Sequence, residues 1–246
     1  MRPIYLLGQY IILLSQVFTK PDKWKVFFKQ LLKEIYKLGY DSLSIVCIIS
    51  IFTGAVMAIQ IKLNITSPLM PQYVLGLTTR DTLLLEFSST IMCIILAGKV
   101  GSNIASEIGT MRITEQIDAL TIMGVNTPSY LILPKVVGLM VFTPVLVVFS
   151  MFFGIMGGYT IALFTDMVSV ATWELGIQTD FNEFYVWYSI IKSVIFAFII
   201  STIASYHGYF VKGGALDVGK ASTKSVVVSS IYILLMDVII TKLMLQ

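Results

Sequence analysis

The chain has 246 residues, a net charge of +3 and a mean hydropathy of +0.87. Hydrophobic residues make up 57% of it and charged residues only 13%, which excludes an ordinary soluble domain of this size. The bilayer is therefore its main solvent, and we expect an all-α membrane protein.

The first 42 residues are expected to form helices that lie on the membrane surface. Residues 3–19 are apolar, yet they lack a small-residue cleavage site and precede the basic stretch, which argues against a removable targeting signal. Residues 22–38 place large apolar side chains on one helical face and most lysines elsewhere, a pattern typical of a helix in the headgroup plane. Pro21 separates the two segments. The alternative is a surface helix that packs against its own protein.

Residues 43–246 are expected to form one domain of five membrane-spanning helices. Residues 42–61 and 136–165 contain no Asp, Glu, Lys or Arg, and a span needs roughly 20 apolar residues. Three further apolar runs carry one ionisable residue each, namely Glu86, Lys192 and Asp237. The predicted spans are about 43–63, 83–106, 130–164, 184–206 and 224–244.

The distribution of Lys and Arg predicts the orientation, because the cytoplasmic side of a membrane protein is enriched in them. Seven precede the first predicted span, three surround the connection between spans 2 and 3, and three that between spans 4 and 5. The opposite side holds only three, Lys62, Arg80 and Lys242. This bias of thirteen against three places the N-terminus in the cytoplasm and the C-terminus outside.

The three ionisable residues inside predicted spans are functional candidates, because each costs roughly 2.5–3.5 kcal/mol on insertion scales. With a rise of about 1.5 Å per residue, Glu86, Lys192 and Asp237 all fall in the outer half of the bilayer. Two carboxylates and one ammonium at similar depth suggest an intramembrane charge network. A purely structural pair of Lys192 and Asp237 is the alternative, and it would leave Glu86 to face a cavity, a lipid headgroup or a conformational switch.

A polar segment at about 110–124 connects spans 2 and 3 and is expected to form a short amphipathic helix. Gly109 is expected to end span 2, Thr110 to cap the new helix and Gly124 to close it. At about 20 Å the helix is too short to cross the membrane, so it must lie on the cytoplasmic surface or dock on a partner. An ordinary interfacial connector is the alternative, but it gives no reason for so many acidic residues beside anionic lipid.

Residues that carry metal, redox or nucleotide chemistry are sparse. The two cysteines, Cys47 and Cys93, fall inside predicted spans and have no metal or redox spacing. His207 is the one histidine, and no HExxH pattern or phosphate-binding GxxxxGK(S/T) loop occurs. We therefore expect no catalytic residue, metal site or cofactor in this chain, so that any nucleotide is bound by another subunit.

Several motifs resemble the signature of the MlaE permease family, the membrane subunits of MCE-type lipid ABC transporters. They are Glu86-Phe87, Leu96-Ala-Gly-Lys-Val-Gly-Ser102, Glu107-Ile-Gly-Thr-Met-Arg-Ile-Thr-Glu-Gln-Ile-Asp-Ala-Leu120 and Met123-Gly-Val125. Shorter matches are Phe52-Thr-Gly54, Gln60, Lys192-Ser193, Gly213-Gly-Ala215, Val218-Gly-Lys-Ala-Ser-Thr223 and Leu235-Met-Asp237. The resemblance extends over nearly the whole chain.

This resemblance implies a homodimeric permease in the inner membrane of a bacterium, with phospholipid or a related lipid as cargo. It also implies two cytoplasmic ATPase subunits that would hold ATP and magnesium, a ring of periplasmic MCE proteins and, in some systems, a small STAS-domain protein. No nucleic-acid partner is expected. By the same resemblance the 110–124 segment is the coupling helix seated on the ATPase, with candidate contacts at Arg112, Ile113, Glu115, Gln116, Asp118 and Leu120.

Spans 1, 2 and 5 of both protomers are implied to line the lipid cavity. Span and depth make Met57, Ile61, Leu84, Phe87 and Leu234 candidate acyl-chain contacts, with Gln60 and Glu86 nearer the headgroup. The predicted function is an ABC permease that moves lipid between the cytoplasmic membrane and a periplasmic MCE protein. The alternatives are a non-transporting anchor for the ATPase and MCE proteins, and an intramembrane enzyme that uses Glu86 and Asp237 as an acid/base pair.

Overall fold

The computed structural model describes residues 2–20, 24–65, 70–165 and 168–245, and within these residues the regular structure is helical, with no strands. Five helical stretches are long and apolar enough to cross a membrane. They are Trp24–Asn64, Val74–Ile113, Thr127–Phe164, Glu183–Tyr209 and Ala215–Leu245. The prediction of an all-α membrane protein with five spans is confirmed.

Three of the five stretches are built from several helical segments. The first consists of α2 (Trp24–Glu34), the π-helix η1 (Ile35–Tyr40) and α3 (Asp41–Asn64). The second consists of α4 (Val74–Thr82), the π-helix η2 (Leu83–Ile91), α5 (Met92–Leu96), the π-helix η3 (Ala97–Gly101) and α6 (Ser102–Ile113). The third consists of α8 (Thr127–Leu131) and α9 (Leu133–Phe164), and the last two are α11 (Glu183–Tyr209) and α12 (Ala215–Leu245). Outside them lie α1 (Arg2–Val17), α7 (Gln116–Ile122) and α10 (Val170–Gln178).

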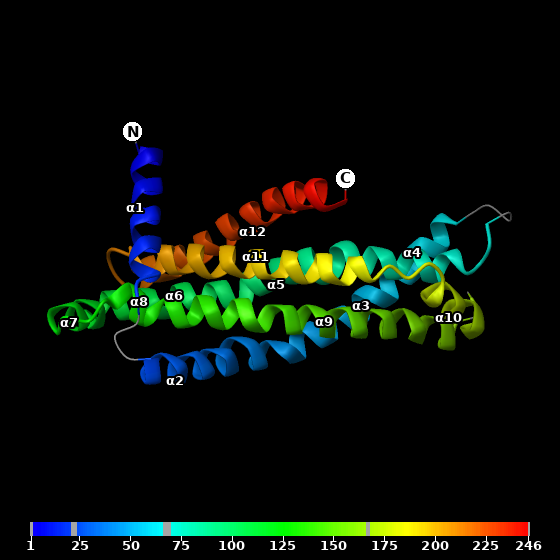
Figure 1. Ribbon diagram of the computed structural model, residues 1–246, viewed down its shortest axis with the longest axis horizontal. Coiled ribbons are helices and arrows are strands. Elements are labelled where there is room, and N and C mark those ends of the chain that lie inside the picture. The colour runs from blue at the N-terminus through cyan, green and yellow to red at the C-terminus, as the bar shows by residue number, and fades with distance from the viewer. Residues whose placement is uncertain (1, 21–23, 66–69, 166–167, 246) are drawn as a thin grey trace.

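The spans run along the long axis of an elongated bundle (Figure 1). α7 lies at one tip of this bundle, and α4 and α10 lie together toward the other tip. These tips are called the α7 end and the α10 end below. α3 packs along α9, while α11 contacts α9, α6 and α12 and so forms the centre of the bundle.

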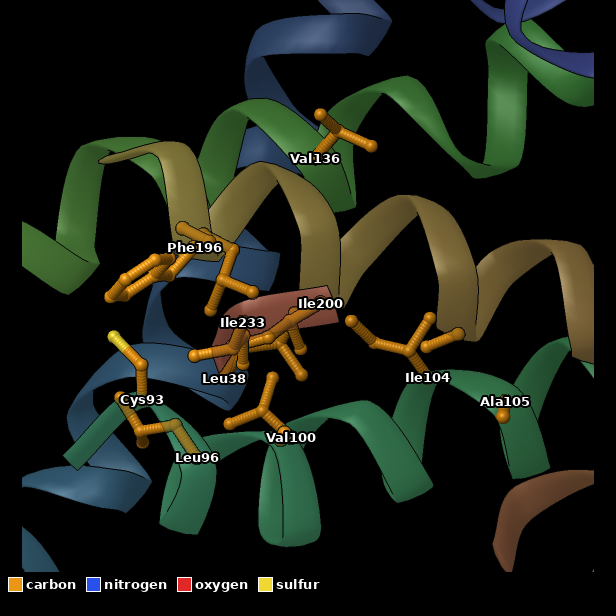
Figure 2. Close-up of a cluster of buried hydrophobic side chains, with 14 of the residues drawn as sticks. Leu38, Cys93, Leu96, Val100, Ile104, Ala105, Val136, Phe196, Ile200 and Ile233 are labelled. Atoms are coloured by element: carbon orange, nitrogen blue, oxygen red, sulfur yellow. The ribbon is translucent and has the colours of Figure 1, made fainter. Parts of the chain in front are cut away.

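Apolar side chains from all five stretches meet around α11 (Figure 2). Phe196 and Ile200 of α11 belong to this cluster together with Leu38, Cys93, Leu96, Val100, Ile104, Ala105, Val136 and Ile233. Lipid tails are as apolar as these side chains, so the close packing of the cluster is what favours association of the helices.

Glycines bring α3 and α9 into backbone contact. A Cβ atom at Gly54 would overlap the carbonyl oxygen of Gly154, and one at Gly157 would overlap the carbonyl oxygen of Ile51. Small residues at such points let two membrane helices approach more closely than larger side chains allow. α3 is therefore held against α9 through the middle of the bundle.

The two N-terminal helices run in different directions relative to the bundle. α1 crosses the bundle axis near the α7 end, whereas α2 runs along α9 (Figure 1). The expected placement of residues 22–38 in the headgroup plane stays a prediction, and residues 22 and 23 lie outside the described residues. α2 continues through η1 into α3, so the helical stretch is continuous across residues 42 and 43, and Glu34 pairs with Lys135 of α9.

Candidate functional site

The three charged residues predicted inside the spans come from three different helices. Glu86 lies on η2, Lys192 on α11 and Asp237 on α12. η2 packs against α11 and also contacts α12. The packing of these helices places both carboxylates within ion-pair distance of one ammonium group.

Lys192 is the centre of the resulting cluster. Its Nζ lies 3.2 Å from Glu86 Oε2 and also forms an ion pair with Asp237 Oδ1. The same ammonium donates hydrogen bonds to the Leu85 carbonyl oxygen at 3.2 Å and to the Tyr188 hydroxyl at 3.1 Å. The charge of Lys192 is thus compensated from several directions, which a charge inside a bilayer requires.

Thr90 links the two carboxylates. Its hydroxyl lies 3.2 Å from Glu86 Oε2 and 3.0 Å from Asp237 Oδ1, and it can donate its proton to one of them at a time. Thr90 lies one turn after Glu86 on η2, and Tyr188 in turn hydrogen-bonds the Thr241 hydroxyl at 2.7 Å. Thr90 and Tyr188 could not be identified from the sequence, because an isolated hydroxyl in an apolar helix forms no distinctive pattern.

The burial of the three charges is unequal. The Lys192 side chain is fully buried, that of Asp237 is 15% exposed and that of Glu86 is 40% exposed. Lys192 pairs with both carboxylates, so all three residues form one cluster and Lys192 and Asp237 are not an isolated pair. Glu86 is the member of the cluster that a ligand or a partner at the surface of this chain can reach most easily.

The predicted acyl-chain contacts fall into different environments. Leu234 is exposed, and Met57, Ile61 and Phe87 are half-buried. Gln60, which lies on the same helix as Met57, is exposed. Leu84 is buried against Val147 and Met151, so its side chain does not face a lipid in this chain. Phe87 lies beside a small crevice between α3, η2 and α9, whose lining includes Thr53 and Ser150.

The polar segment between spans 2 and 3 begins later than expected. α6 passes through Gly109 and Thr110 without interruption and ends at Ile113, and the chain turns at Glu115, which has a φ of 59°. Gly109 lies within the helix and serves packing, since its missing side chain leaves room for Val218 and Val211. A Cβ atom at position 109 would lie 3.1 Å from a side-chain carbon of Val218. The separate helix is α7, Gln116–Ile122. The closing role of Gly124 agrees with its φ of +80°.

The predicted coupling residues therefore lie on both sides of a break in the helix. Arg112 and Ile113 belong to the last turn of α6, while Gln116, Asp118 and Leu120 belong to α7. An ion pair of 2.6 Å between Arg112 Nη1 and Asp118 Oδ1 crosses the break. The apolar residues that protrude most at this tip are Ile122, which is 87% exposed, and Met123. These two were not among the predicted contacts.

A second cluster of charges lies toward the α7 end and was not predicted. Lys135 Nζ on α9 lies 2.8 Å from Glu34 Oε1 on α2 and 2.8 Å from Glu107 Oε2 on α6. Lys37 Nζ on η1 lies 2.9 Å from the same Glu107 oxygen. Lys135 has almost no exposed surface. One indication of this cluster is present in the sequence, namely that Lys135 directly precedes the charge-free run of residues 136–165.

At the α10 end, Arg80 joins α4 to the end of α10. Its guanidinium is buried and donates from Nη1 to the carbonyl oxygens of Ile177 at 2.6 Å and Thr179 at 2.7 Å. It also pairs with Asp81 at 2.8 Å. Carbonyl groups at the end of a helix have no hydrogen-bond partner within the helix, and a cation placed there also interacts favourably with the helix dipole.

The two charged clusters consist of lysine and carboxylate side chains joined by ion pairs. Within the part of the chain that the structure describes, no group of three or more His, Cys, Asp or Glu residues could hold a metal ion. Cys93 is buried in the core and Cys47 is half-buried, both as free thiols. The ion pairs of each cluster connect the helices to which their residues belong.

Comparison with known proteins identifies the family of the chain. The family described as Permease MlaE matches residues 31–243. A probable ABC transporter permease protein of Rickettsia bellii is 33% identical over 242 residues, which cover 96% of this chain and 91% of the relative. One of Synechocystis is 30% identical over 239 residues, which cover 95% and 89%. The chloroplastic protein TRIGALACTOSYLDIACYLGLYCEROL 1 of Arabidopsis thaliana is 29% identical over 238 residues, which cover 96% and 67%. The chain therefore belongs to the MlaE permease family, and it is a membrane permease subunit of the ABC transporter type.

Proposed function

We propose that the chain moves phospholipid, or a related lipid, between the cytoplasmic membrane of a bacterium and a periplasmic MCE protein. The observation that carries this proposal is the cluster of Glu86, Lys192 and Asp237, because its buried cation holds a partly exposed carboxylate inside an apolar bundle. Such a site suits a cargo that has both a polar headgroup and apolar chains. The Arabidopsis relative, whose name is that of a diacylglycerol lipid, supports the same class of cargo.

The energy for transport is proposed to come from a partner ATPase that binds ATP and magnesium. The chain has no phosphate-binding loop of its own, and an ABC permease works with such a subunit. α7 is the proposed contact, because it projects at the tip of the bundle with Ile122 and Met123 exposed (Figure 1). The excess of Lys and Arg around this connection supports a cytoplasmic location for it.

A second copy of the chain is proposed to complete the lipid site. α12 is the least buried of the five spans. It presents a row of exposed apolar side chains that includes Val227, Ile231, Leu234, Leu235 and Val238. A dimer formed along this face would bring two copies of Glu86 and Asp237 to the sides of one cavity, with MCE proteins at the α10 end. A STAS-domain protein would bind on the side of the ATPase.

The mechanism that follows is mechanical. ATP-driven closure of the ATPase dimer displaces α7, the two protomers shift against each other, and the lipid between them passes to or from the MCE channel. The cluster of charges holds the headgroup through Glu86 and its bound cation, while apolar side chains of α3 and α12 contact the acyl chains. No bond of the lipid is made or broken.

The test is ATP-dependent transfer of a fluorescent phospholipid in proteoliposomes that contain the chain, its ATPase and its MCE protein. We expect transfer with an active ATPase and none with an inactive one. Glu86→Gln should lower transfer roughly tenfold, while the complex stays intact on a sizing column. ATP hydrolysis without any lipid transfer would overturn the proposal. Unchanged transfer in both Glu86→Gln and Lys192→Met would favour the anchor.

A further inference from the structure

The helices that lead into and out of α7 form one hairpin, residues 102–164, with α6 as its first arm and α9 as its second. Glu107 lies six residues before the end of α6, and Lys135 is the third residue of α9. The ion pair of 2.8 Å between Lys135 and Glu107 therefore joins the two arms close to α7.

The same ammonium reaches outside the hairpin. Lys135 Nζ also lies 2.8 Å from Glu34 Oε1, at the end of α2, and Glu107 Oε2 receives Lys37 Nζ of η1 at 2.9 Å. Both outer partners belong to the helical stretch Trp24–Asn64, which contains span 1. Four charged side chains thus tie span 1 to the base of the hairpin that carries α7.

These contacts are sealed from solvent at their centre. The side chain of Lys135 is 4% exposed and that of Glu34 is 13% exposed. Glu34 Oε2 is buried and has no hydrogen-bond partner among the described residues. Buried ion pairs contribute little net stability compared with well-packed apolar residues. Stability alone therefore gives a weak reason for two lysines and two glutamates here.

We propose that Lys135 is a positioning residue that couples span 1 to the ATPase. Together with Glu34, Lys37 and Glu107 it forms a strap that makes the stretch Trp24–Asn64 move with the α6–α9 hairpin when α7 is displaced. This inference rests on the proposed function, since it names the route from the ATPase to the span that carries Met57 and Gln60. The strap stays closed throughout the cycle.

The first experiment measures phospholipid transferred per ATP hydrolysed in the reconstituted complex. Glu34→Gln keeps the size of the side chain but removes one charge from the strap, and Lys135→Met removes its centre. We expect the ratio to fall at least about fivefold in both, and to be largely retained in Lys135→Arg. Lys220→Met is the matched control, because it breaks an exposed ion pair with Asp217 near the start of α12.

A merely structural role would give a different result. It would lower ATP hydrolysis and lipid transfer together, through loss of folded complex, and would leave their ratio unchanged. An unchanged ratio in Glu34→Gln would therefore overturn the strap. If Lys135→Met fails to fold, the ratio of lipid transferred to ATP hydrolysed in Glu34→Gln and Lys135→Arg still tests the proposed strap.

A disulfide offers the converse test. A Cβ atom at Gly138 of α9 would lie 3.6 Å from the Cβ atom of Glu34, which is within the range of about 3.5–4.5 Å for disulfides. Glu34→Cys with Gly138→Cys, in a background of Cys47→Ser and Cys93→Ala, should couple poorly when reduced. Oxidation should restore the ratio of lipid to ATP to that of the background. Loss of transfer on oxidation would show that α2 must leave α9, and would overturn the proposal.

The failure of the proposed function can be recognised separately. A wild-type complex that hydrolyses ATP without moving phospholipid would reject lipid transport before any variant is compared. Spin labels on Leu63→Cys of α3 and Leu243→Cys of α12 then report the strap without any lipid. An ATP-dependent change in their distance should shrink in Glu34→Gln, and the same change in both proteins would overturn the strap.

Discussion

At the scale of residues, Lys192 has the largest influence on the candidate site, because it compensates two carboxylates from within the core. The sequence predicted that Glu86, Lys192 and Asp237 lie at similar depth, since a single charge in an apolar run is conspicuous. It could not predict the second cluster, where Glu34 and Lys135 stand 101 positions apart. Glu34 lies among lysines on an amphipathic helix, so its partner could not be identified from local pattern.

Replacing Lys192 by Met should destabilise the chain strongly. The change leaves Glu86 and Asp237 without their cation, and breaking one side of a buried ion pair costs about 3–5 kcal/mol. Unfolding of the purified chain in mixed detergent micelles, followed by circular dichroism, measures the free energy. Lys220→Met, on the exposed surface of α12, should change it by less than about 0.5 kcal/mol. Similar losses in the two variants would contradict the central role of Lys192.

At the scale of elements, the spans were predictable because the bilayer requires about 20 apolar residues for each. The break before α7 was not, because a glycine that packs and a glycine that ends a helix look alike in a sequence. Gly109 continues α6 beside Val218, while the turn occurs at Glu115, a residue type that rarely adopts a positive φ. The amphipathic pattern of residues 22–38 was equally ambiguous, because it does not distinguish a helix in the headgroup plane from one that packs against its own protein, as α2 packs against α9.

The contact between α3 and α9 should depend on Gly54. A Cβ atom in Gly54→Ala would overlap the backbone of Gly154, which side-chain rearrangement cannot relieve. We expect a loss of about 1–3 kcal/mol in the free energy of unfolding. Gly98→Ala is the control, because a Cβ there meets nothing within 4 Å. Equal melting temperatures for the two variants would argue against backbone contact between these helices.

The end of α7 should depend on the backbone freedom of Gly124. Its φ of +80° is unfavourable for any residue with a Cβ, at roughly 1–2 kcal/mol, although no other atom would contact that Cβ. Gly124→Ala should therefore loosen α7 and speed amide hydrogen exchange in residues 116–122. Gly219→Ala, in an open position within α12, should leave that exchange unchanged. Equal protection of α7 in the two variants would exclude a role for this turn.

At the scale of the whole molecule, the bundle is packed around α11 and leaves α12 on its outside. The sequence indicated five spans but not which one would remain uncovered, because that depends on contacts between distant segments. An apolar helix on the surface of a membrane protein can face lipid or a second copy. The shape of one chain therefore makes the oligomeric state the next property to measure.

A bulky side chain on the exposed face of α12 should disrupt the proposed dimer. Ile231→Trp changes a residue that is exposed in the single chain, so folding should be preserved while the facing helix is pushed away. Val148→Trp makes the same kind of change on the exposed surface of α9. Single-molecule photobleaching in native membranes should then count one copy for Ile231→Trp and two for Val148→Trp. Two copies in both would exclude this face as the dimer contact.

The buried guanidinium of Arg80 connects the two helices at the α10 end to the helix of the charge cluster. It fastens the last carbonyls of α10 to α4, and α4 continues directly into η2, which carries Glu86. A displacement of α10 would therefore act on α4 and, through it, on the helix that carries Glu86. The same helical stretch, Val74–Ile113, starts beside α10 and ends just before α7, so one stretch of helix connects the two ends of the bundle and carries Glu86 between them.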